Sequence, residues 1–424
     1  MVFRPNPFNP NSIVAPTLFA GRANQVLQVL NKLTQVRMGM PASFVLQGDR
    51  GIGKTALAKL IMYVAESNDS KLNNLNFLTC YYSVEKGQSF DSVLETIFNL
   101  MTDRMPETIL NRLSHRLGNL FKNGKFNIGV FGTSIGYEGN VKASQEDPIL
   151  IIKDRAVSVL SNIISGFEEI SDENKKDGIL LVIDEIHNLR DVEGAAQTLR
   201  AISTTLDVNR LGKISFMVIG YPEGIERFFT GDPSAKRHFD LIELSPMPRE
   251  EAKEILVKGF KSVQLSFDEN ELDQRIDVAG GYPHSIQMIG HYLVDVDQDS
   301  NIDKDDWDKA LQRSAEELAR KDFSDMYDFS GKGTLRETVL NILALAGKPL
   351  SKQKLRELSD KKNIYTKTCL GELKKSGAIK ELPDGMILLH SMLFRAAILF
   401  NLYKKAKDDD YYKNLIEKMN MYSQ

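Results

Sequence analysis

The segment that most constrains the fold of this chain is Gly48-Asp-Arg-Gly-Ile-Gly-Lys-Thr55, which matches the pattern G-x-x-x-x-G-K-[ST] at every fixed position. An apolar run at 43–47 precedes it, and a segment with helical periodicity, 54–66, follows it. Between a strand and a helix, such glycines turn successive backbone N–H groups inward, and the start of the helix adds its positive end. The segment therefore predicts an α/β fold with a phosphate-binding loop at the end of a buried strand.

The residues of this loop are candidates for binding a nucleotide. Lys54 would reach the β- and γ-phosphates, and the Thr55 hydroxyl would ligate Mg²⁺. The candidate contacts with the cofactor ATP are Gly48, Asp49, Arg50, Gly51, Ile52, Gly53, Lys54, Thr55 and Ala56. The alternative, a glycine turn beside a surface lysine, agrees less well with the flanking strand and helix.

A second apolar run, 178–183, ends in Asp184 and Glu185. We expect Asp184 to support Mg²⁺ beside the phosphate loop and Glu185 to polarise the attacking water. Two acids after a strand can also form a solvated helix cap, but a position roughly 130 residues after a phosphate loop is more specific. The two motifs together predict ATP binding and hydrolysis.

Strands and helices alternate through the first part of the chain. Apolar strands are expected at 43–47, 77–84, 178–183 and 214–219, with helices at 22–37, 54–66, 90–102, 108–121 and 148–170. Strands that are apolar on both faces indicate a parallel sheet covered on both sides. We expect this α/β domain to span residues 1–245, with a glycine-rich β-hairpin insertion at about 122–142.

The rest of the chain predicts two smaller domains. Residues 246–330 have a mainly helical pattern, and we expect residues 330–333 to form a linker. Three helical segments follow at 335–346, 352–359 and 365–376, and then a strand–turn–strand at 381–389. Three helices followed by a β-hairpin are typical of a winged helix, so we expect residues 331–424 to form a winged-helix domain with an added C-terminal helix.

On these motifs the chain resembles the AAA+ superfamily, and within it the origin-recognition or initiator-type ATPases and the prokaryotic signal-transduction ATPases. The resemblance also rests on residues 8–22, 218–224, 232–246 and 280–284. It implies that residues 246–330 are a helical lid over the nucleotide. It also implies that Ile13 and Val14 line the pocket for the base, although core packing would explain both residues equally well.

The resemblance also implies roles for residues in the segments 232–246 and 218–224. Arg237 corresponds to an arginine finger that reaches the γ-phosphate of a neighbouring subunit, which implies a homo-oligomer. Lys236 is a rival for that role, and a plain surface ion pair is the alternative. Gly220 or Tyr221 stands where relatives place a polar residue that reads the γ-phosphate.

Residues 280–284 resemble the family's second sensor, a segment of the lid in which many members carry an arginine that contacts the γ-phosphate. This segment departs from the family pattern. Pro283 would pack on the nucleotide, but His284 follows it where many members have arginine. His390 invites comparison with a phosphate-contacting histidine of signal-transduction ATPases, although a packed or surface histidine is the better interpretation of one matching residue. The altered sensors predict slow hydrolysis.

The net charge of −3 conceals a strong asymmetry. Residues 348–380 carry ten basic and three acidic side chains, a charge of +7, so the rest of the chain carries −10. Double-stranded DNA is therefore a candidate partner of the winged helix. The contacts would come from Tyr365, Thr366, Lys367, Lys374 and Lys375. The alternative is a lysine-rich face that only contacts protein.

The cysteine content and the apolar stretches of the sequence indicate the compartment in which the protein is expected. Cys80 and Cys369 are the only cysteines, which excludes a disulfide framework and fits a reducing compartment. The first residues lack the apolar core of a signal peptide, and no apolar stretch is long enough to span a membrane. We therefore expect a cytoplasmic ATPase switch that couples nucleotide state to oligomerisation and DNA engagement. The alternative is a signalling or defence-type ATPase that regulates a separate effector protein.

Overall fold

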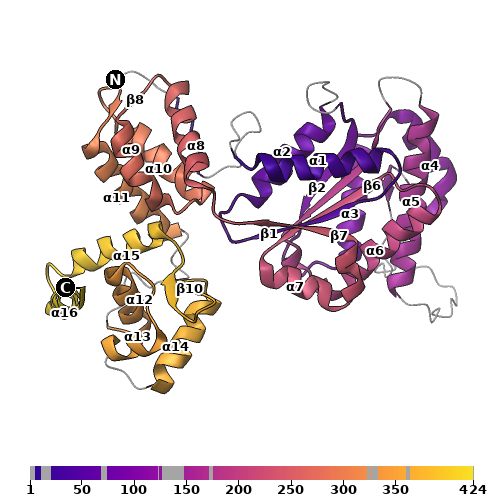
Figure 1. Cartoon of the computed structure of the whole chain (residues 1–424). Coiled ribbons are helices and arrows are strands. Elements are labelled where there is room, and N and C mark those ends of the chain that lie inside the picture. Colours follow the sequence, from indigo (N-terminus) through magenta and orange to yellow (C-terminus); the bar gives the residue numbers. More distant parts are fainter. Residues whose placement is uncertain are drawn as a thin grey trace. The chain divides into compact units, whose positions relative to one another are not determined.

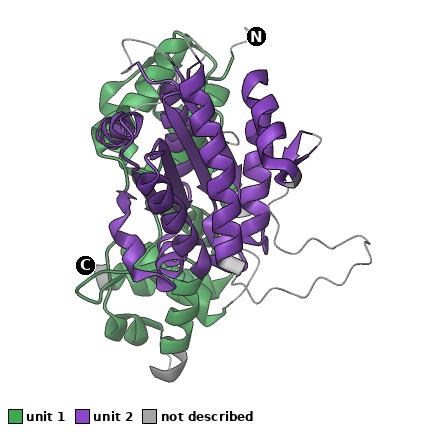
Figure 2. Cartoon of the chain, turned by 90° about the vertical axis from the view of Figure 1, so that its right-hand side faces the viewer, with its two compact units in different colours: residues 1–13, 246–424 green, residues 14–245 purple. Residues whose placement is uncertain are grey.

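A computed structural model of the chain describes residues 5–10, 21–67, 74–122, 124–126, 148–170, 175–321, 326, 333–359 and 363–423 (Figure 1). The chain forms two compact units, shown in different colours in Figure 2. Residues 14–245 make up the sheet unit, and residues 1–13 together with 246–424 make up the helical unit. Each unit is described by itself.

Five parallel strands form the sheet unit's central layer. They are β1 (Ser43–Gly48), β2 (Phe77–Ser83), β5 (Gly178–Asp184), β6 (Ile214–Gly220) and β7 (Phe239–Leu244). Their order across the sheet is β2-β5-β6-β1-β7, so β5, β6 and β1 lie inside it. In the register, Asp184 pairs with Ser83 and Gly220 pairs with Gln47. The residues that end β1, β5 and β6 therefore meet at one edge of the sheet.

Seven helices accompany these strands in the described part of the sheet unit. They are α1 (Ala23–Arg37), α2 (Lys54–Glu66), α3 (Phe90–Thr102), α4 (Glu107–Leu117), α5 (Pro148–Glu169), α6 (Val192–Val208) and α7 (Pro222–Thr230). Two 3₁₀ turns, η4 (Ile186–Asn188) and η5 (Pro233–Arg237), follow β5 and α7. A third, η3 (Gly118–Leu120), follows α4.

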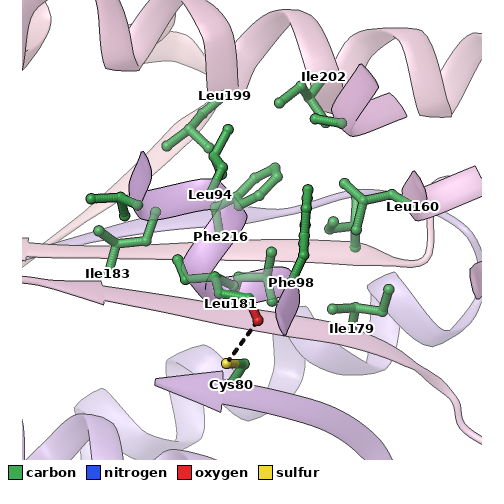
Figure 3. Packing of buried hydrophobic residues seen from close by; sticks show 14 of the residues in the cluster. Cys80, Leu94, Phe98, Leu160, Ile179, Leu181, Ile183, Leu199, Ile202 and Phe216 are labelled. Atoms are coloured by element: carbon green, nitrogen blue, oxygen red, sulfur yellow. Dashed lines mark hydrogen bonds between the residues drawn. The ribbon is translucent and has the colours of Figure 1, made fainter. Parts of the chain in front are cut away.

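The core of this unit lies between the sheet and the helices α3, α5 and α6, as Figure 3 shows. Leu181 of β5 and Phe216 of β6 are fully buried there beside Phe98 of α3. Burying each such side chain stabilises the fold by about 1.5–3 kcal/mol. The thiol of Cys80 donates a hydrogen bond to the carbonyl of Ile97 at 3.6 Å, and burial raises its pKa to about 11. Cys80 is therefore a packing residue and not a nucleophile.

The strand β7 was not among the strands expected from the sequence. Phe239, Ile242 and Leu244 are buried, whereas Leu241 and Glu243 face outward. This edge strand buries one face and pairs with β1 alone, so it lacks the continuous apolar run that identified its neighbours. The expected hairpin insertion is described only at its base, where β3 (Phe121–Lys122) pairs with β4 (Lys125–Phe126). Residues 127–147 lie outside the described part of the chain.

The helical unit begins with α8 (Arg249–Ser262), α9 (Glu269–Arg275), the 3₁₀ turn η6 (Ile276–Ala279), α10 (Pro283–Val296) and α11 (Lys304–Lys321). Two short strands that the sequence did not predict, β8 (Ser266–Phe267) and β9 (Asn301–Ile302), pair in parallel between them. The unit continues with α12 (Leu335–Ala346), α13 (Lys352–Ser359), α14 (Asn363–Lys375), β10 (Ile379–Glu381), β11 (Ile387–Leu389), α15 (Met392–Lys405) and α16 (Asp410–Ser423).

One large hydrophobic core extends from α8 to α16 in this unit. It includes Leu293 of α10, Trp307 of α11, Leu340 of α12 and Phe394 of α15, all almost fully buried. The strands β10 and β11 form an antiparallel hairpin, and Leu350 forms a bridge with Ile387. The segments predicted as a lid and as a winged helix therefore share one core.

The N-terminal segment belongs to the same unit. Phe8 is 3% exposed, and its ring packs edge-on against Phe260 of α8 at 5.7 Å between centroids. A Cβ atom at Gly290 of α10 would lie 2.7 Å from this ring, and one at Gly259 of α8 would lie closer still. Asn6 donates a hydrogen bond of 2.9 Å to the carbonyl of His291. Glycines on two helices thus create the pocket that Phe8 fills.

Ile13 and Val14, predicted to line the base pocket, lie outside the described residues. Within the described part of the chain, no helix is long and apolar enough to cross a membrane.

Candidate nucleotide-binding site

The phosphate loop joins β1 to α2 and depends on its glycines. Gly53 has φ 94°, in the left-handed region that glycine adopts without strain, and its carbonyl begins the hydrogen bonding of α2. A Cβ atom at Gly48 would lie 2.8 Å from the carbonyl oxygen of Leu244 and 2.9 Å from Cγ2 of Ile52. The loop is therefore pressed against β7, and its backbone N–H groups precede the N-terminus of a thirteen-residue helix.

Lys54 is the buried cation of this loop. Its side chain is only 7% exposed, and Nζ donates hydrogen bonds to the carbonyls of Gly48 at 2.8 Å and Asp49 at 2.9 Å. Burial lowers the pKa of the ammonium group, and the nearby charges of Glu185 and Asp184 oppose that shift. The ammonium group also lies 4.4 Å from the ring centroid of Tyr221.

A hydroxyl and a carboxylate meet where α2 begins and β5 ends. Thr55 Oγ1 donates a hydrogen bond of 2.6 Å to Oδ2 of Asp184, which is 1% exposed. The hydroxyl of Tyr81 on β2 donates to the same oxygen at 2.9 Å. Burial, the Asp184 charge and this hydrogen bond raise the pKa of Tyr81. The sequence analysis missed Tyr81, because only the pairing of β2 with β5 brings it to the site.

Glu185 adopts an unusual backbone conformation. Its φ is 56°, and left-handed backbone in a residue other than glycine costs about 1–3 kcal/mol and is typical of functional sites. Its N–H donates to Oδ1 of Asp184 at 2.7 Å, and Oε2 of its carboxylate lies 3.1 Å from Nε2 of His187. The turn after β5 thus bends the chain so that the two acids take different partners.

The chemistry of these residues fits a nucleotide with Mg²⁺. Within the described residues, no group of three or more His, Cys, Asp or Glu side chains could hold a metal ion by itself. Asp184 and Thr55 instead offer one carboxylate and one hydroxyl, the kind of partial site that Mg²⁺ takes when phosphates supply further ligands. A buried lysine and a helix N-terminus suit the anionic phosphates themselves. The other loop candidates, Asp49, Arg50, Gly51, Ile52 and Ala56, lie on the same loop and first helical turn.

Arg237 ends the 3₁₀ turn η5 and is exposed, as is its rival Lys236. The base of this turn is anchored by Asp232, which is 8% exposed and accepts hydrogen bonds from Ser234 N at 3.0 Å and Arg200 Nε at 2.6 Å. An exposed arginine on an anchored turn is available to a second molecule. The arginine-finger assignment stays a prediction.

The residues that resemble the second sensor lie in the helical unit. Pro283 and His284 are the first residues of α10, and the contact of Pro283 with a nucleotide stays a prediction. Tyr282, just before them, receives a hydrogen bond of 2.7 Å from Lys380 Nζ of β10. The ring of His390 packs against Tyr282 at 5.5 Å between centroids. The structure therefore brings together two of the segments that the sequence analysis singled out.

The basic residues proposed for DNA contact are not equivalent. Lys367 and Lys375 of α14 are exposed. Lys374 donates a hydrogen bond of 2.6 Å to Glu381 of β10. The side chains of Tyr365 and Thr366 lie outside the described part of α14.

A five-stranded parallel sheet with a phosphate loop after β1 and an acidic pair after β5 defines the α/β P-loop ATPase fold of the AAA+ type. Residues 18–219 match the family model described as the AAA ATPase domain, and this segment contains both motifs. The resemblance to the AAA+ superfamily inferred from the motifs is therefore confirmed for these residues, which match this family model. No curated protein matches the sequence.

Solved structures resemble the chain beyond this domain. The Walker-type ATPase paby2304 of Pyrococcus abyssi matches with a TM-score of 0.53 at 13% identity, covering 94% of this chain and 99% of that one. The Aeropyrum pernix ORC2 protein, in ADPNP–ADP complexes, matches with a TM-score of 0.54 at 14% identity, covering 97% of both chains. At these identities the likeness concerns the fold alone.

Proposed function

We propose that the sheet unit binds ATP with Mg²⁺ and hydrolyses it to ADP and phosphate. The observation that carries this proposal is the hydrogen bond of 2.6 Å between Thr55 Oγ1 and Asp184 Oδ2, beside the buried ammonium group of Lys54. Thr55 and Asp184 would hold Mg²⁺, which supplies positive charge at the phosphates. Lys54 and the loop N–H groups bind phosphate oxygens, and the carboxylate of Glu185 takes a proton from the attacking water.

Glu185→Gln tests this assignment. The amide keeps the shape of the side chain but cannot accept the proton, so ATP binding should persist while turnover falls by about 10²–10⁴-fold. The measurements are phosphate release and the affinity for a fluorescent non-hydrolysable ATP analogue. Lys54→Ala is the companion variant, which should weaken binding itself. Turnover by Glu185→Gln at the wild-type rate would show that Glu185 is not the base.

We also propose that hydrolysis controls an assembly. Arg237 is exposed on a turn anchored by Asp232, which supports a role at the nucleotide of a neighbouring subunit. A guanidinium group in that position would stabilise the negative charge of the transition state and make hydrolysis depend on a homo-oligomer.

The output we propose is engagement of double-stranded DNA by a winged helix, formed by α12, α13, α14 and the β10–β11 hairpin. The exposed Lys367 and Lys375 on α14 support this proposal, as does the charge of +7 over residues 348–380. Binding of a duplex oligonucleotide, measured by fluorescence anisotropy at several salt concentrations, tests it. A lack of binding at low salt, with and without ATP analogue, would contradict it.

A second candidate output is regulation of a separate effector protein without DNA contact. The observation that favours it is that several lysines of residues 348–380 pair with other residues of the helical unit. Glu381 engages Lys352 and Lys374, and Lys380 donates a hydrogen bond to Tyr282. Charges that stabilise the helical unit itself contribute less to a surface for phosphate binding.

A further inference from the structure

His187 connects the proposed base to an aromatic neighbour. Its Nε2 lies 3.1 Å from Oε2 of Glu185, and its ring packs against that of Tyr221 at 4.6 Å between centroids. Its other nitrogen, Nδ1, is buried and has no hydrogen-bond partner among the described residues. A proton on Nε2 therefore has the Glu185 carboxylate as its acceptor, whereas a proton on Nδ1 would be a buried donor without an acceptor.

Two glycines let the turn that carries His187 approach the end of β6. A Cβ atom at Gly224, in the first turn of α7, would lie 2.6 Å from Cβ of His187. A Cβ atom at Gly220, the last residue of β6, would lie 2.9 Å from Cγ2 of Ile186. Both distances are too short for real Cβ contacts. The glycines on either side of Tyr221 thus allow η4 to pack closely against the segment that carries this tyrosine.

The same tyrosine contacts the phosphate loop. The Lys54 ammonium group lies 4.4 Å from the centroid of the Tyr221 ring, a favourable cation–π distance. Burial raises the pKa of the Tyr221 hydroxyl, and the Glu185 charge adds to that shift, so the side chain stays neutral at physiological pH. Contacts therefore run without a break from Lys54 through Tyr221 and His187 to Glu185.

Resting on the proposed function, we propose that His187 and Tyr221 are positioning residues for hydrolysis. The Nε2–H group of His187 donates a hydrogen bond to Oε2 of Glu185 and fixes the carboxylate. Oε1 of Glu185 is then the oxygen that takes the proton of the attacking water. The ring of Tyr221 packs against the imidazole ring of His187 and connects the position of His187 to that of Lys54.

Substitutions of His187 test the hydrogen bond. His187→Ala should lower kcat about 10- to 100-fold, because a misplaced base loses much of its effect, while the affinity for a non-hydrolysable ATP analogue changes less than about twofold. His187→Gln should recover most of kcat, because its amide N–H group can donate to the same carboxylate oxygen. His115→Ala, at an exposed histidine on α4, is the control. An unchanged or increased kcat in His187→Ala, or no recovery with Gln, would overturn the proposal.

Two further variants keep His187 and disturb its position. Gly224→Ala should displace the imidazole ring and lower kcat in the same way. Gly371→Ala is the matched control, because a Cβ atom there would meet nothing within 4 Å. Tyr221→Phe keeps the ring and should retain kcat, whereas Tyr221→Leu should lose it. Equal kcat in Gly224→Ala and Gly371→Ala would count against the proposal even if His187→Ala fails to fold.

Comparison with Glu185→Gln separates this inference from the proposed function. If Glu185→Gln abolishes turnover but His187→Ala leaves kcat unchanged, only the positioning role fails. If Glu185→Gln still hydrolyses ATP at the wild-type rate, the assignment of the base fails, and the positioning role fails with it.

Discussion

Glu381 on β10 accepts a hydrogen bond of 2.6 Å from Nζ of Lys374 on α14. Its other carboxylate oxygen lies 2.5 Å from Nζ of Lys352 on α13. Hydrogen bonds from Lys352 and Lys374 lower the pKa of Glu381 to about 2. A lowered pKa means that the ion pairs contribute stability above the ordinary pKa of glutamate and lose it as the pH falls toward 2. Mild acid will therefore not release these lysines.

The first prediction concerns the charge available for DNA. Glu381→Gln removes the negative charge that competes with phosphates for Lys352 and Lys374, so affinity for duplex DNA should increase. The slope of log affinity against log salt should steepen by about 1–2, since each additional phosphate contact adds about 0.9. Glu372→Gln, at an exposed acid on α14, is the control for a simple change in net charge. Equal slopes in the two variants would mean that the Glu381 pairs do not limit DNA binding.

The second prediction concerns Arg237. Arg237→Ala should bind ATP normally and hydrolyse it about 10³-fold more slowly in the assembled state, the lower end of the range for an arginine finger. Lys236→Ala, the exposed neighbour, is the control and should retain its rate. In mixtures with Lys54→Ala subunits, Arg237→Ala subunits should regain activity, because each variant lacks a different half of the shared site. Activity that only follows the average of the two variants would exclude action between subunits.

The third prediction concerns the phosphate loop. Gly48→Ala places a methyl group 2.8 Å from the carbonyl oxygen of Leu244, a backbone atom of β7 that cannot easily move. The loop should shift, and affinity for an ATP analogue should fall at least about tenfold, equivalent to about 1.4 kcal/mol. Fluorescence titration measures the affinity, with Gly371→Ala as the control. Wild-type affinity in Gly48→Ala would show that the loop tolerates a side chain there.

The fourth prediction concerns the N-terminal segment. Phe8→Ala empties the pocket between α8 and α10, and it should reduce the free energy of unfolding of the helical unit by about 3–5 kcal/mol. Hydrogen exchange of α10 amides measures this unit separately from the sheet unit. Phe400→Ala on α15, whose side chain is 42% exposed, should cost less than half as much. Similar losses in both variants would contradict the packing role of Phe8.

The continuous apolar runs of β1, β5 and β6 identified these strands from sequence, because strands inside a parallel sheet bury both faces. The edge strand β7 has only alternating burial, and β8 and β9 are two residues long. None of these three strands carries enough pattern to be predicted. The helices α12 and α13 begin and end where the periodicity indicates.

Local motifs in the sequence predicted part of the site, but they could not predict which residues of neighbouring strands come together there. Lys54, Thr55 and Asp184 lie together, as their motifs and strand ends predict. Tyr81 comes to Asp184 from β2, about one hundred residues away in sequence, and His187 acquires its neighbour Tyr221 only when β6 lies beside β5. A tyrosine in a strand and a histidine in a turn are ordinary in sequence, so only the folded arrangement of the strands identifies them.

The pocket of Phe8 also constrains the order in which the protein forms on the ribosome. The walls of this pocket, Gly259 and Gly290, are synthesised about 250 and 280 residues after Phe8 itself. The sheet unit, residues 14–245, is complete before either wall exists. Phe8 must therefore remain without its pocket while the sheet unit is synthesised, and its packing against α8 and α10 is a late step in the formation of the helical unit.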